Sequence, residues 1–388
     1  MKVGYSFWGF LGDMKFTPFG KLASTPDGNA FYSWSIINEL QKRGHDVFFM
    51  MPDRDADGIA VIGRDIMFNS WASDKRRSAY DNAIKCMSTT GDYMLTKQSV
   101  FGLWDAAGCN DIDVILHEWR MEIPGRNTEE CRDVLKNDWQ PDLFIQNCVI
   151  DYCEERDIKL VIFDLDYKVT EGDIDKMMSR GIDVTVLELG NKWKDKEWAK
   201  KVFIPFDFTS IYEFKPECFV NDKLVYVGNR YERDWCIDKY IPTDIDGVAV
   251  YGNWDEGGRD SKKKWPGIDF RHRLQTCEMH DVYSDSATTI LLAKRDYCEF
   301  GFMTARIIEA LFYCSVPLFI EEYGDELIEQ FAGGASGYLT VRSVDDVTKK
   351  SSELFTNYVM RCTIINNMRE RVRKFMDVRF FVDELLSC

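Results

Sequence analysis

The recurrence of short apolar runs between polar helical stretches is the feature that most limits how this chain can fold. Runs of this kind occupy residues 2–7, 45–50, 113–117, 142–146, 159–163, 183–187, 224–227, 248–251, 288–293 and 316–320. Continuous apolar runs of about four to eight residues are typical of strands in parallel sheets that helices cover on both faces. The sequence therefore predicts an α/β protein in which strands and helices alternate.

The first 50 residues contain the clearest unit of this alternation. A strand at residues 2–7 leads into a glycine-rich loop, and apolar residues at three- and four-residue spacing between Ala30 and Leu40 then predict a helix. Gly44 ends that helix, and residues 45–50 form the next predicted strand. Strand, loop, helix and strand in this order make a right-handed βαβ unit.

The length of the chain predicts two domains. With 388 residues the chain is long for a single hydrophobic core. The alternation is interrupted near Ile204–Asp207 and begins again at Leu224. We therefore expect two Rossmann-like domains facing each other across a cleft, formed by residues 1–205 and 206–357. The last helical pattern, within residues 358–388, is expected to return and pack on the first domain.

Charge and composition limit the expected partners. A formal net charge of −16 disfavours a protein whose whole surface binds a polyanion. Basic clusters at residues 75–77, 262–264, 271–273 and 369–374 leave room for a local DNA-binding groove, although each is also consistent with a solvated face. The sequence shows no apolar stretch of about 18 residues, no secretory signal and no CxxC pair, so we expect a cytoplasmic protein without a membrane span.

The predicted helix after Gly301 is the most specific stretch for chemistry. Thr304 stands at the expected N-cap, behind which backbone N–H groups can receive an anion such as a diphosphate. Arg306 adds a permanent positive charge. Glu309 follows three residues later on the same helix face and can accept hydrogen bonds from ribose hydroxyls. The alternative is an ordinary surface ion pair between Arg306 and Glu309.

Two carboxylates, Asp164 and Asp166, follow the predicted strand at residues 159–163. In open parallel sheets, ligands bind beyond the carboxyl ends of the strands. Three interpretations stay open at this point. The pair binds a divalent metal together with a sugar nucleotide, or it supplies a catalytic carboxylate beside an acceptor hydroxyl, or it caps the following turn.

Two further residues are candidates for acid–base catalysis. His117 stands at the end of an apolar run, and histidine is the usual general base near neutral pH. Asp27 lies in the first loop, where its alternative role is to cap the helix that follows. The glycine loop lacks the G-x-G-x-x-G spacing of nicotinamide sites, and no P-loop and no G-x-S-x-G elbow is present.

The segment around Arg306 resembles the donor-binding helix of GT-B glycosyltransferases, in which an R-x-x-E-A pattern precedes a small-residue turn and a strand with an early proline, as at Ser315–Pro317. Residues 26–50 are similar to the first βαβ unit of the same class. The resemblance implies that the second domain binds a UDP-sugar donor, that the first domain binds the acceptor, and that no metal is obligatory.

A finer resemblance links the segments Tyr226–Arg233 and Tyr251–Trp254 to glycosyltransferases of tailed phages, and more faintly to α-glucosyltransferases that modify phage DNA. It implies a donor-binding set that consists of Gly228, Asn229, Arg230, Arg233, Gly252, Thr304, Arg306 and Glu309. It also implies that Asp166 lies by the acceptor hydroxyl. The E-x7-E pattern of the family is not met, because Gly301 stands eight residues before Glu309, so the group that touches the donor sugar stays open.

These observations predict transfer of glucose or arabinose from a UDP-sugar to a hydroxyl acceptor, with hydroxymethylcytosine in double-stranded phage DNA as the first choice. A base inside a duplex would have to be flipped out to react. The alternatives are an acceptor that is a cell-surface glycan, a protein or a small molecule, or a non-catalytic protein that binds sugar nucleotides. The expected compartment is the cytoplasm of an infected host cell.

Overall fold

The computed structural model describes residues 1–6, 29–50, 52–54, 60–62, 97–106, 108–119, 141–209, 211–255, 260–274 and 276–388. The chain divides into two compact units. Unit 1 comprises Met1–Met14, Ile36–Val202 and Val382–Cys388, and unit 2 comprises Lys15–Ser35 and Phe203–Phe381. The sequence-based boundary at 205/206 lies close to this division, whereas residues 358–381 belong to unit 2 and only the last seven residues to unit 1.

Unit 1 contains a parallel sheet with the strand order β2-β1-β5-β6-β7-β8. Its strands are β1 (Lys2–Ser6), β2 (Asp46–Phe49), β5 (Val114–Trp119), β6 (Lys159–Asp164), β7 (Val184–Glu188) and β8 (Ala199–Lys201). Its helices are α4 (Lys97–Ala106), η2 (Cys109–Asp111), α6 (Pro141–Arg156), α7 (Glu171–Ser179) and the second half of α1 (Asn29–Lys42), whose residues up to Ser35 belong to unit 2. Strand β3 (Pro52–Arg54) pairs antiparallel with β4 (Ala60–Ile62). Side chains of Arg43 and Lys200 donate hydrogen bonds to Asp383 and Ser387, which fasten the chain end to this unit.

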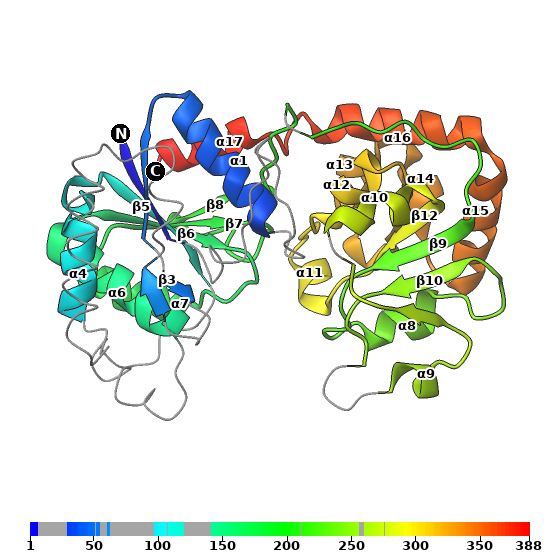
Figure 1. The fold of residues 1–388 in the computed structure, drawn as a ribbon, viewed down its shortest axis with the longest axis horizontal. Helices are drawn as coiled ribbons and strands as arrows, with labels where there is room; N and C mark the ends of the chain where they lie inside the picture. The colour runs from blue at the N-terminus through cyan, green and yellow to red at the C-terminus, as the bar shows by residue number, and fades with distance from the viewer. Residues whose placement is uncertain are drawn as a thin grey trace. The chain divides into compact units, whose positions relative to one another are not determined.

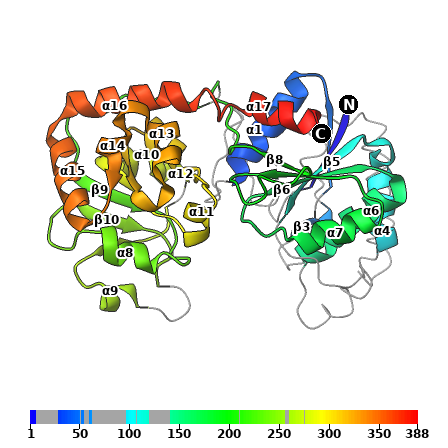
Figure 2. The ribbon, with the colours of Figure 1, turned by 180° about the vertical axis from the view of Figure 1, so that it is seen from behind.

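Unit 2 contains a second parallel sheet with the order β11-β10-β9-β12-β13-β14. Its strands are β9 (Asp222–Val227), β10 (Val248–Tyr251), β11 (Asp269–Arg271), β12 (Ser286–Leu291), β13 (Val316–Ile320) and β14 (Thr340–Val341). The helices are α8 (Asp234–Tyr240), α9 (Ser261–Lys264), α10 (Thr276–Ser284), α11 (Arg295–Glu299), α12 (Arg306–Phe312), η4 (Glu321–Tyr323), α13 (Asp325–Ala332), η5 (Gly333–Ala335), α14 (Ser336–Leu339), α15 (Val344–Thr356), α16 (Tyr358–Val372) and α17 (Val378–Leu386), which ends in unit 1. Figures 1 and 2 show helices on both faces of each sheet.

The strand order of unit 2 follows the classical dinucleotide-binding arrangement. Numbered from β9, the sheet reads 3-2-1-4-5-6, which is the order of the Rossmann fold. The predicted α/β class with two Rossmann-like sheets is therefore confirmed. Among the described residues, no helix is long and apolar enough to cross a membrane.

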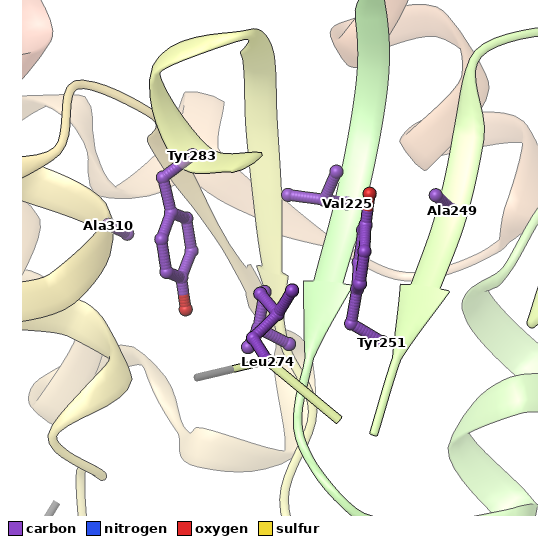
Figure 3. Close-up of a cluster of buried hydrophobic side chains, with 7 residues drawn as sticks. Val225, Ala249, Tyr251, Leu274, Tyr283 and Ala310 are labelled. Carbon is purple, nitrogen blue, oxygen red and sulfur yellow. The ribbon is translucent and has the colours of Figure 1, made fainter. Parts of the chain in front are cut away.

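A buried cluster in unit 2 connects the sheet to the helices that carry the candidate site. Its members are Val225, Val227, Ala249, Tyr251, Leu274, Tyr283 and Ala310. Figure 3 shows Tyr283 beside Ala310 of α12, with Val225 and Tyr251 on the neighbouring strands. Because Tyr283 and Ala310 are wholly buried, the position of α12 on the sheet is fixed by packing.

One predicted strand is wrong. Residues 142–146 lie in helix α6, which begins at Pro141 and continues to Arg156. Proline is favoured at the first position of a helix, and the buried residues continue well past the short run, through Val149 and Tyr152. A run of five residues cannot by itself distinguish a strand from one turn of a buried helix. The predicted C-terminal helical pattern is two helices, α16 and α17.

Candidate functional site

The strand order places the candidate site of unit 2 at the carboxyl end of β9. From β9 the chain continues to β10 and β11 on one side, and then crosses to β12 on the other side. Connections therefore diverge between β9 and β12, and such a switch point is where open α/β sheets bind ligands. Residues from the ends of β9 and β10 and from α12 meet there.

Two glycines allow the ends of β9 and β10 to approach each other. Gly252 has a φ of 142°, and a Cβ atom on it would lie 2.2 Å from the carbonyl oxygen of Gly228. A Cβ atom on Gly228 would lie 2.5 Å from the Oη of Tyr226 and 2.7 Å from the Nη2 of Arg306. Gly252 therefore requires glycine, because backbone atoms of Gly228 stand in the way and its φ is positive, whereas a side chain at Gly228 would require the ends of Tyr226 and Arg306 to move.

Arg306 lies at the end of β9. Its Nε donates a hydrogen bond to the carbonyl oxygen of Val227, and its guanidinium stacks 5.7 Å from the ring centroid of Tyr226. Burial lowers the pKa of Arg306, but the neighbouring Tyr226 and Glu309 more than compensate and raise it, so the group is always charged. No hydrogen bond from its two Nη atoms is found within the described residues, and these donors remain available to a ligand.

Glu309 lies one turn further along α12. One carboxylate oxygen accepts a hydrogen bond from the hydroxyl of Tyr283 at 3.1 Å. Burial raises the pKa of Glu309, and the charge of Arg306 opposes this shift. The two side chains do not form the surface ion pair that was the alternative, since no carboxylate of the described residues lies within ion-pair distance of Arg306. Oε1 of Glu309 makes no hydrogen bond there either and can accept one from a ligand.

The two arginines after β9 differ in what they contact. Arg230 forms a bidentate salt bridge with Asp234, in which Nε and Nη2 donate to the two carboxylate oxygens at 2.7 and 2.6 Å. Its Nη1 donates to the carbonyl oxygen of Trp254 and to the hydroxyl of Ser261 at 3.3 Å each. Its charge is therefore already neutralised and its donors are occupied. Arg230, which was predicted to bind the donor, accordingly has a structural role here.

Arg233 is buried, and no carboxylate of the described residues lies within ion-pair distance of it. Its Nη1 donates to the backbone oxygens of Asn229 and Tyr231 at 3.3 and 3.1 Å, and its Nε makes no hydrogen bond. A buried cation without a counter-ion is costly unless a ligand supplies the charge. The side chain of Asn229 is occupied, since its Oδ1 accepts a hydrogen bond from the backbone N–H of Asn253.

Several buried hydroxyls of unit 2 have no hydrogen-bond partner among the described residues. They are Oγ1 of Thr304 and the Oη atoms of Tyr226 and Tyr323, together with the hydroxyls of Ser315 and Tyr338. The expected N-cap role of Thr304 is wrong, because α12 begins at Arg306 with Ala305 in the N-cap position. Thr304 therefore contributes a hydroxyl ahead of the helix rather than a cap.

At the carboxyl end of β6 in unit 1, Asp164 is wholly buried and fastens a turn. It accepts hydrogen bonds from the backbone N–H groups of Lys168 and Val169 at 2.9 and 3.2 Å. Burial raises the pKa of Asp164 to about 6, although these two hydrogen bonds lower it. The turn-capping interpretation accounts for this carboxylate.

Asp166 is carried on the loop that Asp164 fastens. The ammonium group of Lys192 donates to the carbonyl oxygens of Tyr167 and Val169 at 3.0 and 2.8 Å, so the loop is held from the adjacent connection as well. Asp166 itself is half-buried. The loop therefore presents one carboxylate beyond the sheet while Asp164 stays inside.

His117 lies within β5 and not beyond its end. Its Nδ1 is 2.9 Å from the hydroxyl of Ser6, and its Nε2 is 3.4 Å from Oε1 of Gln146. Burial lowers the pKa of His117 to about 4, so the imidazole is neutral and weakly basic at pH 7. These contacts indicate a satisfied core histidine. Asp27 lies outside the described residues.

Sequence reasoning missed Lys192, Glu188, Tyr226 and Tyr323. Glu188 ends β7 beside Asp164 and accepts a hydrogen bond from the backbone N–H of Trp193. Its position as a carboxylate at the end of a predicted strand is the signal that could have identified it. In the sequence, Tyr226 and Tyr323 cannot be distinguished from tyrosines of the hydrophobic core. No group of three or more His, Cys, Asp or Glu side chains that could hold a metal ion is found in the part of the chain that the structure describes.

Comparison with known proteins places this geometry in a fold. No protein-family model matches the sequence, and no curated protein matches it. A solved structure of the DNA-modifying enzyme β-glucosyltransferase, determined with and without uridine diphosphoglucose, is similar with a TM-score of 0.57 and 14% identity over 96% of each chain. A mutant of a T4 phage protein in complex with UDP-glucose is similar with a TM-score of 0.57 and 13% identity over 96% of this chain and 95% of that one. This chain thus has the two-domain GT-B fold that its sequence predicts.

Proposed function

We propose that this protein is a glycosyltransferase that moves glucose or arabinose from a UDP-sugar to a hydroxyl acceptor. The observation that carries the proposal is the set of open polar groups at the carboxyl edge of the sheet in unit 2. Among the described residues, Arg233 and Arg306 have no carboxylate partner, and Glu309 has an oxygen without a hydrogen bond. A diphosphate would neutralise the guanidinium groups, and a ribose hydroxyl would donate to Glu309.

Gly228 and Gly252 support the same assignment. Because neither carries a side chain, the ends of β9 and β10 come close together and the side chains of Tyr226 and Arg306 reach the end of β9, where open α/β sheets bind ligands. The GT-B fold adds weight, since both similar structures were determined with UDP-glucose. Arg230 and Asn229 then act indirectly, by holding the loop after β9.

The acceptor would react at the carboxyl edge of the sheet in unit 1. In the proposed step the acceptor oxygen forms a bond to the anomeric carbon, the bond from that carbon to the diphosphate oxygen breaks, and Asp166 takes the hydroxyl proton. Positive charge on Arg233 and Arg306 stabilises the leaving UDP. The step needs no metal, and Asp164 holds the loop rather than reacting.

For the acceptor we propose hydroxymethylcytosine in phage DNA, which would place the enzyme in the cytoplasm of an infected cell. The similar structure described as a DNA-modifying enzyme supports this choice. The net charge of −16 favours the second candidate, an acceptor without a polyanionic backbone such as a glycan, a protein or a small molecule. A protein that binds sugar nucleotides without catalysis is a third outcome.

The test is nucleoside mass spectrometry on duplex DNA that contains hydroxymethylcytosine, incubated with the protein and a panel of UDP-sugars. Duplex DNA of the same sequence with unmodified cytosine is the control. A pentose or hexose mass added only to the modified base supports the full proposal. UDP release without added mass would overturn the DNA acceptor, and absence of both UDP binding and UDP release would overturn the donor site.

A further inference from the structure

We propose that the phenol hydroxyls of Tyr226 and Tyr323 are additional hydrogen-bond donors to the diphosphate of the donor, an assignment that rests on the proposed function for the identity of the ligand. Tyr226 is 0% exposed and Tyr323 is 3% exposed. Neither Oη has a hydrogen-bond partner. A buried hydroxyl left unpaired costs about 1–3 kcal/mol, so two of them beside two unpaired cations call for a ligand.

Tyr226 is directed toward the end of β9. Its Oη lies 2.5 Å from the point that a Cβ atom on Gly228 would occupy, and Nη2 of Arg306 lies 2.7 Å from the same point. The hydroxyl and the guanidinium are therefore neighbours at the carboxyl edge of the sheet. A group that accepts hydrogen bonds from Arg306 at this place is also within reach of Tyr226 after small movements.

Tyr323 lies in η4, directly after the carboxyl end of β13 and therefore at the same edge of the parallel sheet as the end of β9. Burial raises the pKa of Tyr323 well above the ordinary value, although the charges of Arg306 and Arg233 lower it. Its hydroxyl therefore stays protonated and can donate. Because the surrounding charges are positive, the ligand that satisfies it must accept hydrogen bonds and carry negative charge.

Tyr283 provides an internal comparison. It belongs to the same cluster and is also wholly buried, but its hydroxyl donates to Glu309 at 3.1 Å. The fold can thus supply a partner for a buried phenol at this edge. Unpaired buried hydroxyls also occur at Ser315 and Tyr338, but Tyr226 and Tyr323 are close enough to Arg306 to affect its pKa, so an oxyanion such as a diphosphate fits these two.

The experiment measures binding of UDP, inorganic pyrophosphate and uridine to Tyr226→Phe, Tyr323→Phe and the double variant by calorimetry, together with the Tm of each ligand-free protein. We expect the Kd for UDP and for pyrophosphate to rise about tenfold per substitution, because each removes a hydrogen bond to a charged group. Uridine binding should not change. The Tm should stay the same or rise, since phenylalanine removes an unpaired buried hydroxyl.

Tyr152→Phe is the matched control, because Tyr152 is a buried tyrosine of unit 1 whose hydroxyl donates to Asp105 at 2.6 Å. This variant should lose Tm and keep the wild-type affinity for pyrophosphate. Wild-type affinity for UDP and pyrophosphate in the double variant would overturn the inference, and so would a loss of Tm with unchanged affinity.

Failure of the inference is distinguishable from failure of the proposed function. If Arg306→Gln abolishes UDP binding while both phenylalanine variants bind normally, the donor site stands and the tyrosine assignment is wrong. If the wild-type protein binds pyrophosphate in a tyrosine-dependent way but does not bind UDP, the inference stands and the proposed donor is wrong.

Discussion

The two sheets differ in how the charged and titratable groups near their carboxyl edges are paired, although buried polar atoms without a partner, such as Nε1 of Trp119 and Trp193, occur in unit 1 as well. In unit 1, Asp164, Glu188 and His117 are all buried and all have hydrogen-bond partners within the protein. In unit 2, Arg233 has a buried Nε without a partner, and Arg306 has no counter-ion among the residues described. Both edges belong to Rossmann-like sheets, so the fold alone does not cause this difference.

Burying a charged group is costly unless it is hydrogen-bonded or paired, and Asp164, Glu188 and His117 meet that requirement within unit 1. The contacts of unit 1 hold two loops, one through Asp164 and the other through Glu188. Under the proposed function an anionic ligand pairs with Arg233 and Arg306 of unit 2, so ligand affinity and folding stability should depend on different residues.

The largest expected effect concerns Asp166, the half-buried carboxylate on the loop after β6. Asp166→Asn should lower turnover by about 100-fold or more with donor affinity unchanged, because the amide cannot take the acceptor proton. Steady-state kinetics and UDP titration measure the two quantities. The exposed Asp175→Asn on α7 is the matched control and should behave as wild type. Near-normal turnover of the Asp166 variant would remove this residue from catalysis.

A pair of variants tests whether UDP affinity depends on residues of unit 2 and thermal stability on residues of unit 1. Glu309→Ala should weaken UDP binding by about tenfold or more, through loss of a charged hydrogen-bond acceptor for the ribose, and should leave pyrophosphate binding nearly unchanged. Glu188→Ala should lower the Tm and leave UDP affinity intact, because its carboxylate holds a loop of unit 1. Equal effects of both variants on UDP affinity would contradict the comparison.

The smallest effect is a pH dependence of stability in unit 1. Burial raises the pKa of Asp164 to about 6, above its ordinary value of 3.8. The folded state therefore binds this proton more tightly than the unfolded chain, and the contribution of Asp164 to stability decreases as the pH rises from about 4 to 6, by about 1–3 kcal/mol. Asp164→Asn should abolish that contribution.

Urea unfolding of wild type and Asp164→Asn at pH 4 and at pH 6.5 measures the contribution of Asp164 to the free energy of unfolding. The other titrating groups cancel in the difference between the two proteins. Parallel pH profiles would show that Asp164 has an ordinary pKa in the folded state. In that case burial of the Asp164 carboxylate would carry no measurable energetic cost, and the two units would not differ in this respect.

The sequence predicted the sheets better than the site. The runs at residues 248–251 and 316–320 coincide with β10 and β13, because a continuous apolar run bounded by turn residues allows little else. The run at residues 142–146 failed because its apolar residues also fit a buried helix face. Pattern and resemblance placed Arg306, Glu309 and both glycines at one strand edge.

What the sequence could not show is which polar groups find partners. Arg230 and Arg233 lie three residues apart in the same loop, yet only Arg230 has a carboxylate in reach. The contact of Lys192 with the loop of Asp166 joins residues more than 20 positions apart. A tyrosine with an unpaired hydroxyl and one with a satisfied hydroxyl are identical in the sequence.

The close approach of Gly252 to Gly228 also limits how this part of unit 2 can vary. A Cβ atom on Gly252 would collide with the backbone of Gly228, and the φ of Gly252 is positive, so only glycine fits there. The atoms nearest to a Cβ atom on Gly228 are instead the side-chain ends of Tyr226 and Arg306, which can shift. Sequence variation at this strand end should therefore be confined to side chains, with the backbone at Gly252 as the fixed point around which they change.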